Sequence, residues 1–126
     1  MYEPSRNLFT FHIAGFQFHD GALVLSQLKA GDTLDLVPEP DNPHDPEAVA
    51  IKFNGTMLGY VPGDQNGALS VMMHFGHADV FECRVLQVAP ERSPWHQVRA
   101  GVFVTDKRKM MGTREAADEF EAAGIY

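Results

Sequence analysis

Apolar and polar residues alternate in several short stretches of this chain, which is the pattern of half-buried β-strands. In residues 9–13, for example, Phe9, Phe11 and Ile13 fall on one face. Five further stretches have strand-like composition, at residues 33–37, 48–53, 56–61, 80–88 and 96–104. The hydrophobic pattern therefore predicts six short strands.

Helical spacing follows the fourth predicted strand. Apolar residues at helical intervals in residues 68–75 predict a helix, which Asp64 or Asn66 caps and Gly76 ends. Residues 107–126 predict a second, weakly amphipathic helix at the C-terminus.

Short connections separate the remaining elements. Asn54-Gly55 is the strongest hairpin signal in the chain and joins the third and fourth predicted strands. Residues 22–29 fit either a single helical turn or an irregular cover over the core. After the first strand the alternation changes phase. Either a bulge at Ala14-Gly15 keeps Phe16 and Phe18 in the core, or one or both rings face solvent.

These elements indicate a mainly β, α+β fold: a small, strongly curved β-barrel or half-barrel of six strands with one or two helices. The chain has 126 residues, of which 44% are hydrophobic, which suits one globular domain. No repeat or linker divides it, so we expect a single domain over residues 1–126.

Several classes of protein are excluded by composition. No apolar run approaches the length of a membrane span, and the N-terminus lacks a signal-sequence pattern. We therefore expect a cytoplasmic protein without a membrane partner. Cys83 is the only cysteine, which excludes an internal disulfide. Its place in an alternating run predicts a buried, small apolar residue.

The net charge of −7 argues against strong non-specific binding to nucleic acid, although it does not exclude a local site. The charge is unevenly distributed. Residues 32–47 contain six acidic side chains and no Lys or Arg, whereas residues 92–109 contain five basic side chains and one acidic one.

No catalytic or metal-binding motif is present. Among six histidines only His74 and His77 are closely spaced, and there is no HExxH or Cys-His pattern. No serine lies in a Gly-x-Ser-x-Gly context, and no glycine-rich phosphate loop occurs. We therefore expect no enzyme activity, no metal ion and no cofactor. A hydrolase or metal-assisted nuclease that uses the acidic loop remains an alternative.

The stretch of residues 39–49 contains three prolines among Asn and Asp residues, between two predicted strands. Proline fixes φ and removes a donor, and Asn and Asp side chains bond the nearby backbone. This loop is therefore rigid, and is either a well-made connection or a binding site. Candidate aromatic platforms for stacking bases are Phe16, Phe18, Tyr60 and Trp95.

Three segments together resemble the HIRAN domain family, at residues 13–21, 28–51 and 58–62. The middle segment carries the most specific string, Glu-Pro-x-Asn-Pro-x-Asp-x-x-Ala-Val, and Gly-Tyr-Val-Pro follows it. The similarity covers residues 9–104, with residues 107–126 as a C-terminal helical extension. Many bacterial members are short standalone chains, as we expect this one to be.

The resemblance implies a compact OB-like β-barrel that recognises nucleic acid and is not a catalyst. Fork-remodelling members, which act in DNA repair, capture the 3′-hydroxyl end of single-stranded DNA. By position, the resemblance implies a nucleic-acid-binding pocket formed by Gln17, Phe18, Asn42, His44, Asp45, Tyr60 and Gly63. In that pocket, Asp45 would accept a hydrogen bond from the 3′-hydroxyl.

Several positions depart from the DNA-binding members: Phe18 lacks a hydroxyl, Pro38 replaces a frequent Arg, and two further positions lack a phosphate partner. Gln17 stands where those members have an Arg, and Gly63 stands near a frequent basic residue. Each missing charge-assisted bond is worth about 1.5–3 kcal/mol. The partner expected from the resemblance is a single-stranded DNA end. The alternative is a protein–protein interaction module of the same fold that has lost DNA binding.

Overall fold

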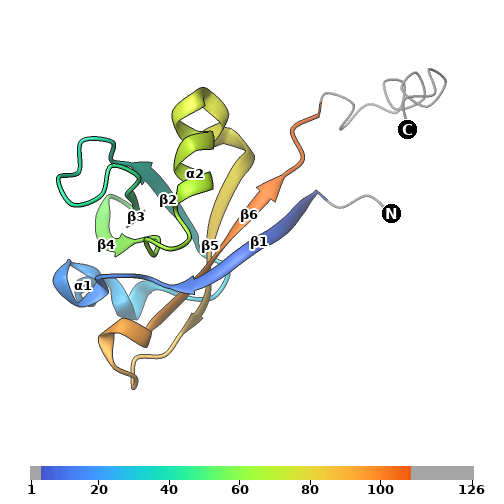
Figure 1. The fold of residues 1–126 in the computed structure, drawn as a ribbon. Coiled ribbons are helices and arrows are strands. Elements are labelled where there is room, and N and C mark those ends of the chain that lie inside the picture. Colours follow the sequence, from blue (N-terminus) through green and yellow to red (C-terminus); the bar gives the residue numbers. More distant parts are fainter. Residues whose placement is uncertain (1–3, 109–126) are drawn as a thin grey trace, which may run out of the picture.

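The computed structural model of the protein describes residues 4–108, which form one antiparallel sheet of six strands. In spatial order the strands are β1-β6-β5-β2-β3-β4. Their bounds are β1 Ser5–His12, β2 Thr33–Pro38, β3 Val49–Phe53, β4 Thr56–Tyr60, β5 Phe81–Val88 and β6 Val98–Thr105. Figure 1 shows β1 and β6 running side by side across the molecule, with β2, β3 and β4 curling away from them.

Short helical segments fill the connections. Helix α1 (Gly21–Val24) and α2 (Gly67–Met72) are the two α-helices, and α2 lies beside β2 and β5 in Figure 1. The other helical turns are η1 Phe16–Phe18, η2 Leu25–Gln27, η3 Met73–His77, η4 Ala78–Val80 and η5 Pro94–His96. Gly76 ends the helical segment with φ at 92°, as a C-terminal glycine does.

The two edges of the curved sheet meet at a single β-bridge between Ala14 and Tyr60. The Ala14 N–H donates to the Tyr60 carbonyl, and the Tyr60 N–H donates to the Ala14 carbonyl, each over 2.9 Å. The strands are not closed by a continuous ladder. The fold is a small, open OB-like barrel whose edges touch at this one point.

Gly59 permits this approach of the two edges. A Cβ placed on Gly59 would lie 2.3 Å from the carbonyl oxygen of Ala14 and 2.7 Å from Cγ2 of Ile13. Its φ of 154° is also a conformation that residues with side chains rarely adopt. A glycine is therefore required beside the bridge.

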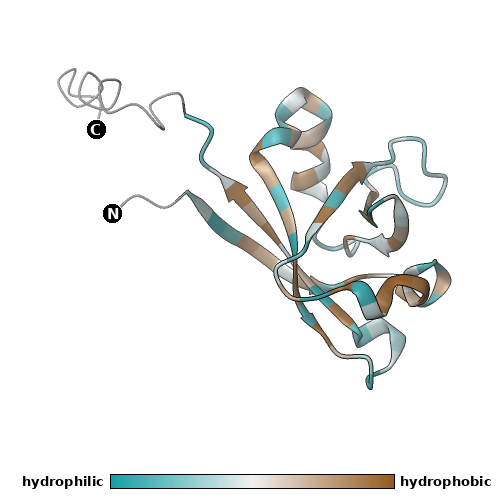
Figure 2. Cartoon of the chain, turned by 180° about the vertical axis from the view of Figure 1, so that it is seen from behind, coloured by the Kyte–Doolittle hydropathy of each residue, from teal (hydrophilic) through white to brown (hydrophobic). Residues whose placement is uncertain are grey.

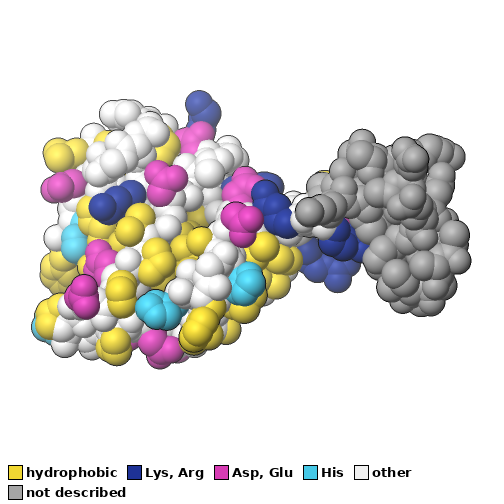
Figure 3. Space-filling view, turned by 90° about the horizontal axis from the view of Figure 1, so that it is seen from above, with side chains coloured by type: hydrophobic (Ala, Val, Ile, Leu, Met, Phe, Trp, Pro, Cys, Tyr) yellow, Lys and Arg dark blue, Asp and Glu magenta, His cyan; other side chains and the backbone are white. Residues whose placement is uncertain are grey.

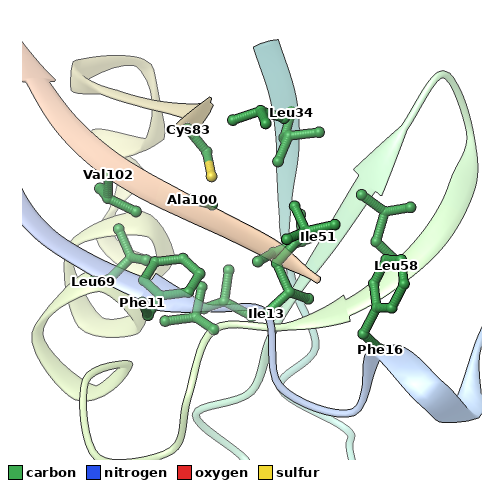
Figure 4. Packing of buried hydrophobic residues seen from close by; sticks show 14 of the residues in the cluster. Phe11, Ile13, Phe16, Leu34, Ile51, Leu58, Leu69, Cys83, Ala100 and Val102 are labelled. Atoms are coloured by element: carbon green, nitrogen blue, oxygen red, sulfur yellow. The ribbon is translucent and has the colours of Figure 1, made fainter. Parts of the chain in front are cut away.

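The hydrophobic core lies inside the curve of the sheet. Figure 4 shows side chains from all six strands and α2 pointing toward one another, with Phe16 beside Leu58 at one end. Cys83 belongs to this cluster, and burial raises the pKa of its thiol to about 12. The prediction that Cys83 is a buried apolar residue is therefore confirmed. Figure 2 shows that the hydrophilic part of the chain includes the long loop between β2 and β3.

The sequence located all six strands, with differences at their ends. The first strand begins at Ser5, four residues before the predicted start, and the sixth begins at Val98, because Pro94–His96 form a helical turn. The hairpin at Asn54-Gly55 is present, and both residues have positive φ. Most of the segment over residues 22–29 is helical, in α1 and η2, which end at Gln27. Almost all of the predicted C-terminal helix, residues 109–126, lies outside the described residues.

Phe16 and Phe18 separate completely: Phe16 is 2% exposed and Phe18 is 79% exposed. Neither a strand nor a bulge is present here. Gly15 adopts φ of 71° and turns the chain into η1, which directs one ring into the core and the other to solvent. Phe16 is therefore a core residue and not a stacking platform.

Replacing Gly59 with alanine should destabilise the fold. The added Cβ collides with the backbone of Ala14, so we expect the free energy of unfolding to fall by about 2–4 kcal/mol. Urea denaturation measures this change. Gly31→Ala is the matched control, because Gly31 has φ of 96° but no atom within 4 Å of an added Cβ. Equal losses in the two variants would show that the close approach at the bridge contributes nothing.

Candidate functional site

The loop between β2 and β3 is held rigid by Asn42. Its Oδ1 atom accepts hydrogen bonds from the backbone N–H groups of His44, over 2.9 Å, and of Asp45, over 3.2 Å. Its Nδ2 atom donates to Glu39 Oε1 over 3.1 Å. One side chain therefore satisfies two backbone donors, which is the bonding that makes Asn favourable in turns.

Asp45 ties the same loop to the start of α2. Its Oδ1 atom accepts from the Glu47 N–H over 2.9 Å, and its Oδ2 atom accepts from Nδ2 of Asn66 over 2.8 Å. Asn66 stands at the predicted cap position, but its side chain caps nothing. It is 2% exposed and is directed to the loop instead. The carboxylate is thus fixed from both sides.

Tyr60, at the end of β4, joins the loop through its hydroxyl. The hydroxyl donates to Glu39 Oε1 over 2.8 Å, and the ring lies edge-on to His19 with centroids 5.7 Å apart. The hydrogen bond to Glu39 and partial burial raise the pKa of Tyr60 above its ordinary value. The tyrosine is therefore held as a neutral donor at the wall of the site.

A pocket of about 520 Å³ opens between η1, this loop and the segment that follows β4. It brings together most of the residues that the sequence predicted for nucleic-acid binding, from segments far apart in the chain. Of that set, the lining includes Phe18, Asn42, His44, Asp45, Tyr60 and Gly63.

Gln17 and Trp95 lie elsewhere. Gln17 is exposed on η1 and is not part of the lining. Trp95 is half-exposed on η5, outside the pocket. Of the predicted residues, Phe18, His44 and Tyr60 thus supply aromatic surface to the pocket.

His19 and Asn66 also line the pocket, and Glu39 accepts hydrogen bonds from Asn42 and Tyr60 of the lining. The sequence prediction did not include these three residues. His19 follows Phe18 directly, and Glu39 begins the Pro-rich loop. The sequence could therefore have indicated both residues, because each is next to a predicted site residue or segment. Asn66 had only the signal of a helix cap, which does not indicate contact with Asp45.

The pocket has a mixed chemical character. Its lining contains aromatic faces, the Asp45 carboxylate and the His19 and His44 imidazoles, but no Lys or Arg. Such a surface suits a flat ring with a hydroxyl or amine donor at its edge. Within residues 4–108, no group of three or more His, Cys, Asp or Glu side chains is arranged to hold a metal ion. No helix in that range is long and apolar enough to span a membrane.

Known proteins share this architecture. A sequence model of the HIRAN domain matches residues 7–105. The crystal structure of a protein from Lactobacillus plantarum has a TM-score of 0.66 at 19% identity, covering 79% of this chain and 94% of that chain. The crystal structure of the HIRAN domain of human HLTF has a TM-score of 0.56 at 19% identity, covering 95% of this chain and 88% of that chain. A comparison with curated proteins found no significant match.

The bond between Tyr60 and Glu39 should make stability depend on alkaline pH. Because folding raises the pKa of Tyr60, its contribution is complete below about pH 10 and is lost as the pH rises through the raised value. In urea denaturation above about pH 10, we expect the stability of the native protein to fall more steeply than that of Tyr60→Phe. Parallel pH profiles for the two proteins would contradict the assignment.

Proposed function

Because this chain belongs to the HIRAN domain family, whose members are nucleic-acid-binding modules, we propose that its pocket holds the 3′-hydroxyl end of single-stranded DNA. One observation carries the proposal. The pocket surrounds a fixed carboxylate, Asp45, with the aromatic faces of Phe18, His44 and Tyr60. Recognition of a strand end needs aromatic side chains that stack on the bases and an acceptor that binds the terminal hydroxyl.

The aromatic side chains supply the contacts to bases. Phe18 is 79% exposed, so its ring offers a free face on one side of the pocket, and His44 is exposed on the other. Stacking of a base on an aromatic side chain is worth about 1–3 kcal/mol and tolerates any base. The module would therefore select a strand end rather than a sequence.

Asp45 supplies the contact to the terminal hydroxyl. A carboxylate has about four lone-pair positions, and the loop and Asn66 each engage one oxygen atom with one hydrogen bond. Each oxygen therefore retains capacity for another donor. A 3′-hydroxyl donates to such an acceptor, whereas a 3′-phosphate brings negative charge against it.

The absence of basic residues from the lining limits the affinity. Gln17 is uncharged and outside the lining, and Gly63 has no side chain. Two missing charge-assisted bonds weaken binding by a factor of about a hundred or more. We therefore expect a weak binder whose 3′-hydroxyl preference is clearest at low salt.

A protein-interaction module is the second candidate, favoured by a different surface. Val71, Met72 and Phe75 on α2 and η3 are exposed apolar residues, beside a groove of about 230 Å³ lined partly by prolines of the loop. Figure 3 shows hydrophobic side chains gathered among single charged groups on this face. The groove and the candidate DNA pocket share no lining residue, so variants separate the two functions.

Asp45→Asn should reduce the preference for a 3′-hydroxyl over a 3′-phosphate. The amide keeps the size of the carboxylate but removes its charge and one acceptor oxygen, so we expect the ratio of the two affinities to fall about tenfold. Fluorescence anisotropy with labelled oligonucleotides at low salt measures that ratio.

Phe75→Ser is the control for this experiment, because it alters the second surface and should leave both affinities unchanged. A purely structural role for Asp45 would lower both affinities equally and leave their ratio intact. No preference in the native protein would reject end recognition itself.

Gly63→Lys should strengthen binding. A Cβ added at Gly63 meets only Asp45 Oδ2, at an ordinary contact distance of 3.9 Å, so the backbone at this position accepts a side chain. A new phosphate partner at the pocket rim should raise affinity for a 3′-hydroxyl oligonucleotide about tenfold. Gly63→Gln controls for side-chain bulk, and an equal gain from Gln would refute the electrostatic explanation.

A further inference from the structure

A third surface, distinct from the pocket and from the apolar groove, lies next to the pocket at the loop of residues 89–97 between β5 and β6. The loop is closed on itself by backbone hydrogen bonds, from Ala89 N–H to the Gln97 carbonyl over 2.8 Å and from Arg92 N–H to the Ala89 carbonyl over 3.0 Å. Gln97 Nε2 also donates to the Pro90 carbonyl over 3.0 Å. These hydrogen bonds fix the backbone of the loop, and therefore the positions from which its side chains extend.

Four basic side chains converge on this surface. His12 at the end of β1 pairs directly with Arg99 on β6, so the two side chains leave the same face of the sheet. The rings of His12 and His96 lie edge to face with centroids 4.9 Å apart. Arg92 and Arg99 are both exposed and lie close enough to act electrostatically on His12.

His12 lies within electrostatic reach of the other three side chains. Its pKa is lowered first by burial and then by His96, Arg92 and Arg99, with no carboxylate among the causes. Glu91 is the single acidic residue in the sequence of the loop. In contrast, Arg84 is paired with Glu82, and Arg108 with Asp106. The charges of Arg92 and Arg99 favour an anionic partner, and the imidazoles of His12 and His96 can add N–H donors to it.

We propose that His12, Arg92, His96 and Arg99 form a phosphate-binding track for the strand that leaves the pocket. This inference rests on the proposed function, and adds where the phosphodiester backbone upstream of the 3′ end lies. The half-exposed Trp95 ring, edge-on to His96 at 6.3 Å, borders the same track. The track compensates for the lack of basic residues inside the pocket.

The position of the surface supports this path. Phe18 on η1 lines the pocket, and η1 packs against η5, which carries Trp95 and His96. In Figure 1 the β5–β6 loop, drawn in orange, lies beside the blue segment that contains η1. A strand passing over η1 therefore reaches the basic surface directly.

Charge determines the direction in which the strand leaves. The loop of residues 39–48 is acidic and contains no Lys or Arg, so a phosphate passing over it is repelled. The opposite side of the pocket leads to Arg92 and Arg99. The distribution of charge on the surface thus directs the phosphodiester backbone of the bound strand across η1 and away from the Pro-rich loop.

Oligonucleotide length tests the inference. A 3′-hydroxyl oligothymidylate of about three nucleotides fills the pocket, whereas one of about ten also reaches the track. We expect Arg92→Gln/Arg99→Gln to bind the short oligonucleotide as the native protein does and the long one about fivefold more weakly. The slope of log affinity against log salt for the long one should fall by about 0.7 per arginine removed.

Two controls accompany this variant. Lys107→Gln removes an exposed charge beyond the far end of β6 and should change neither affinity. Arg92→Lys/Arg99→Lys keeps both charges and should retain the salt slope. If Arg92→Gln/Arg99→Gln gains as much affinity from the longer oligonucleotide as the native protein does, the phosphate-binding track is refuted. That result leaves the proposed pocket unaffected. If the short oligonucleotide shows no 3′-hydroxyl preference, the pocket is refuted and the track with it.

Discussion

The fold depends on the contact at which the two edges of the sheet meet. The Ala14–Tyr60 bridge joins the end of the first strand to the end of the fourth, and the lack of a side chain at Gly59 permits it. Because Phe18 and His19 follow Ala14 closely and Tyr60 belongs to the bridge, this contact also sets two walls of the pocket beside each other. The same contact therefore brings the two sheet edges together and places the two walls of the site beside each other.

Most of the fold was predictable from local pattern, and the part that was not depends on long-range contacts. Alternation and strand-like composition located the six strands, and Asn54-Gly55 located the hairpin between β3 and β4. The separation of Phe16 from Phe18 was not decided by alternation, because it depends on the left-handed conformation of Gly15 next to the bridge. The start of β6 was misplaced for a local reason, since Pro94 begins a helical turn.

The sequence predicted most of the residues that line the candidate pocket, but not the hydrogen bonds between them. The Asn-Pro-x-Asp string brought Asn42 and Asp45 into the set, and the pocket does contain them. The contacts that fix the loop run from Tyr60 to Glu39 and from Asn66 to Asp45, each across 21 positions of sequence. Residue spacing alone does not encode such partners, because they are selected by the curvature of the sheet.

The exposure of Phe18 has a consequence for how this family should be compared across species. Folding by itself already gives Asn42 and Asp45 a role, because their side chains satisfy backbone donors of the loop and, for Asp45, the buried amide of Asn66. Phe18, with 79% of its surface in solvent, supports little of the fold. If the pocket binds as proposed, retention of an aromatic ring at this position among orthologues would accompany binding, and drift to polar residues would accompany its loss.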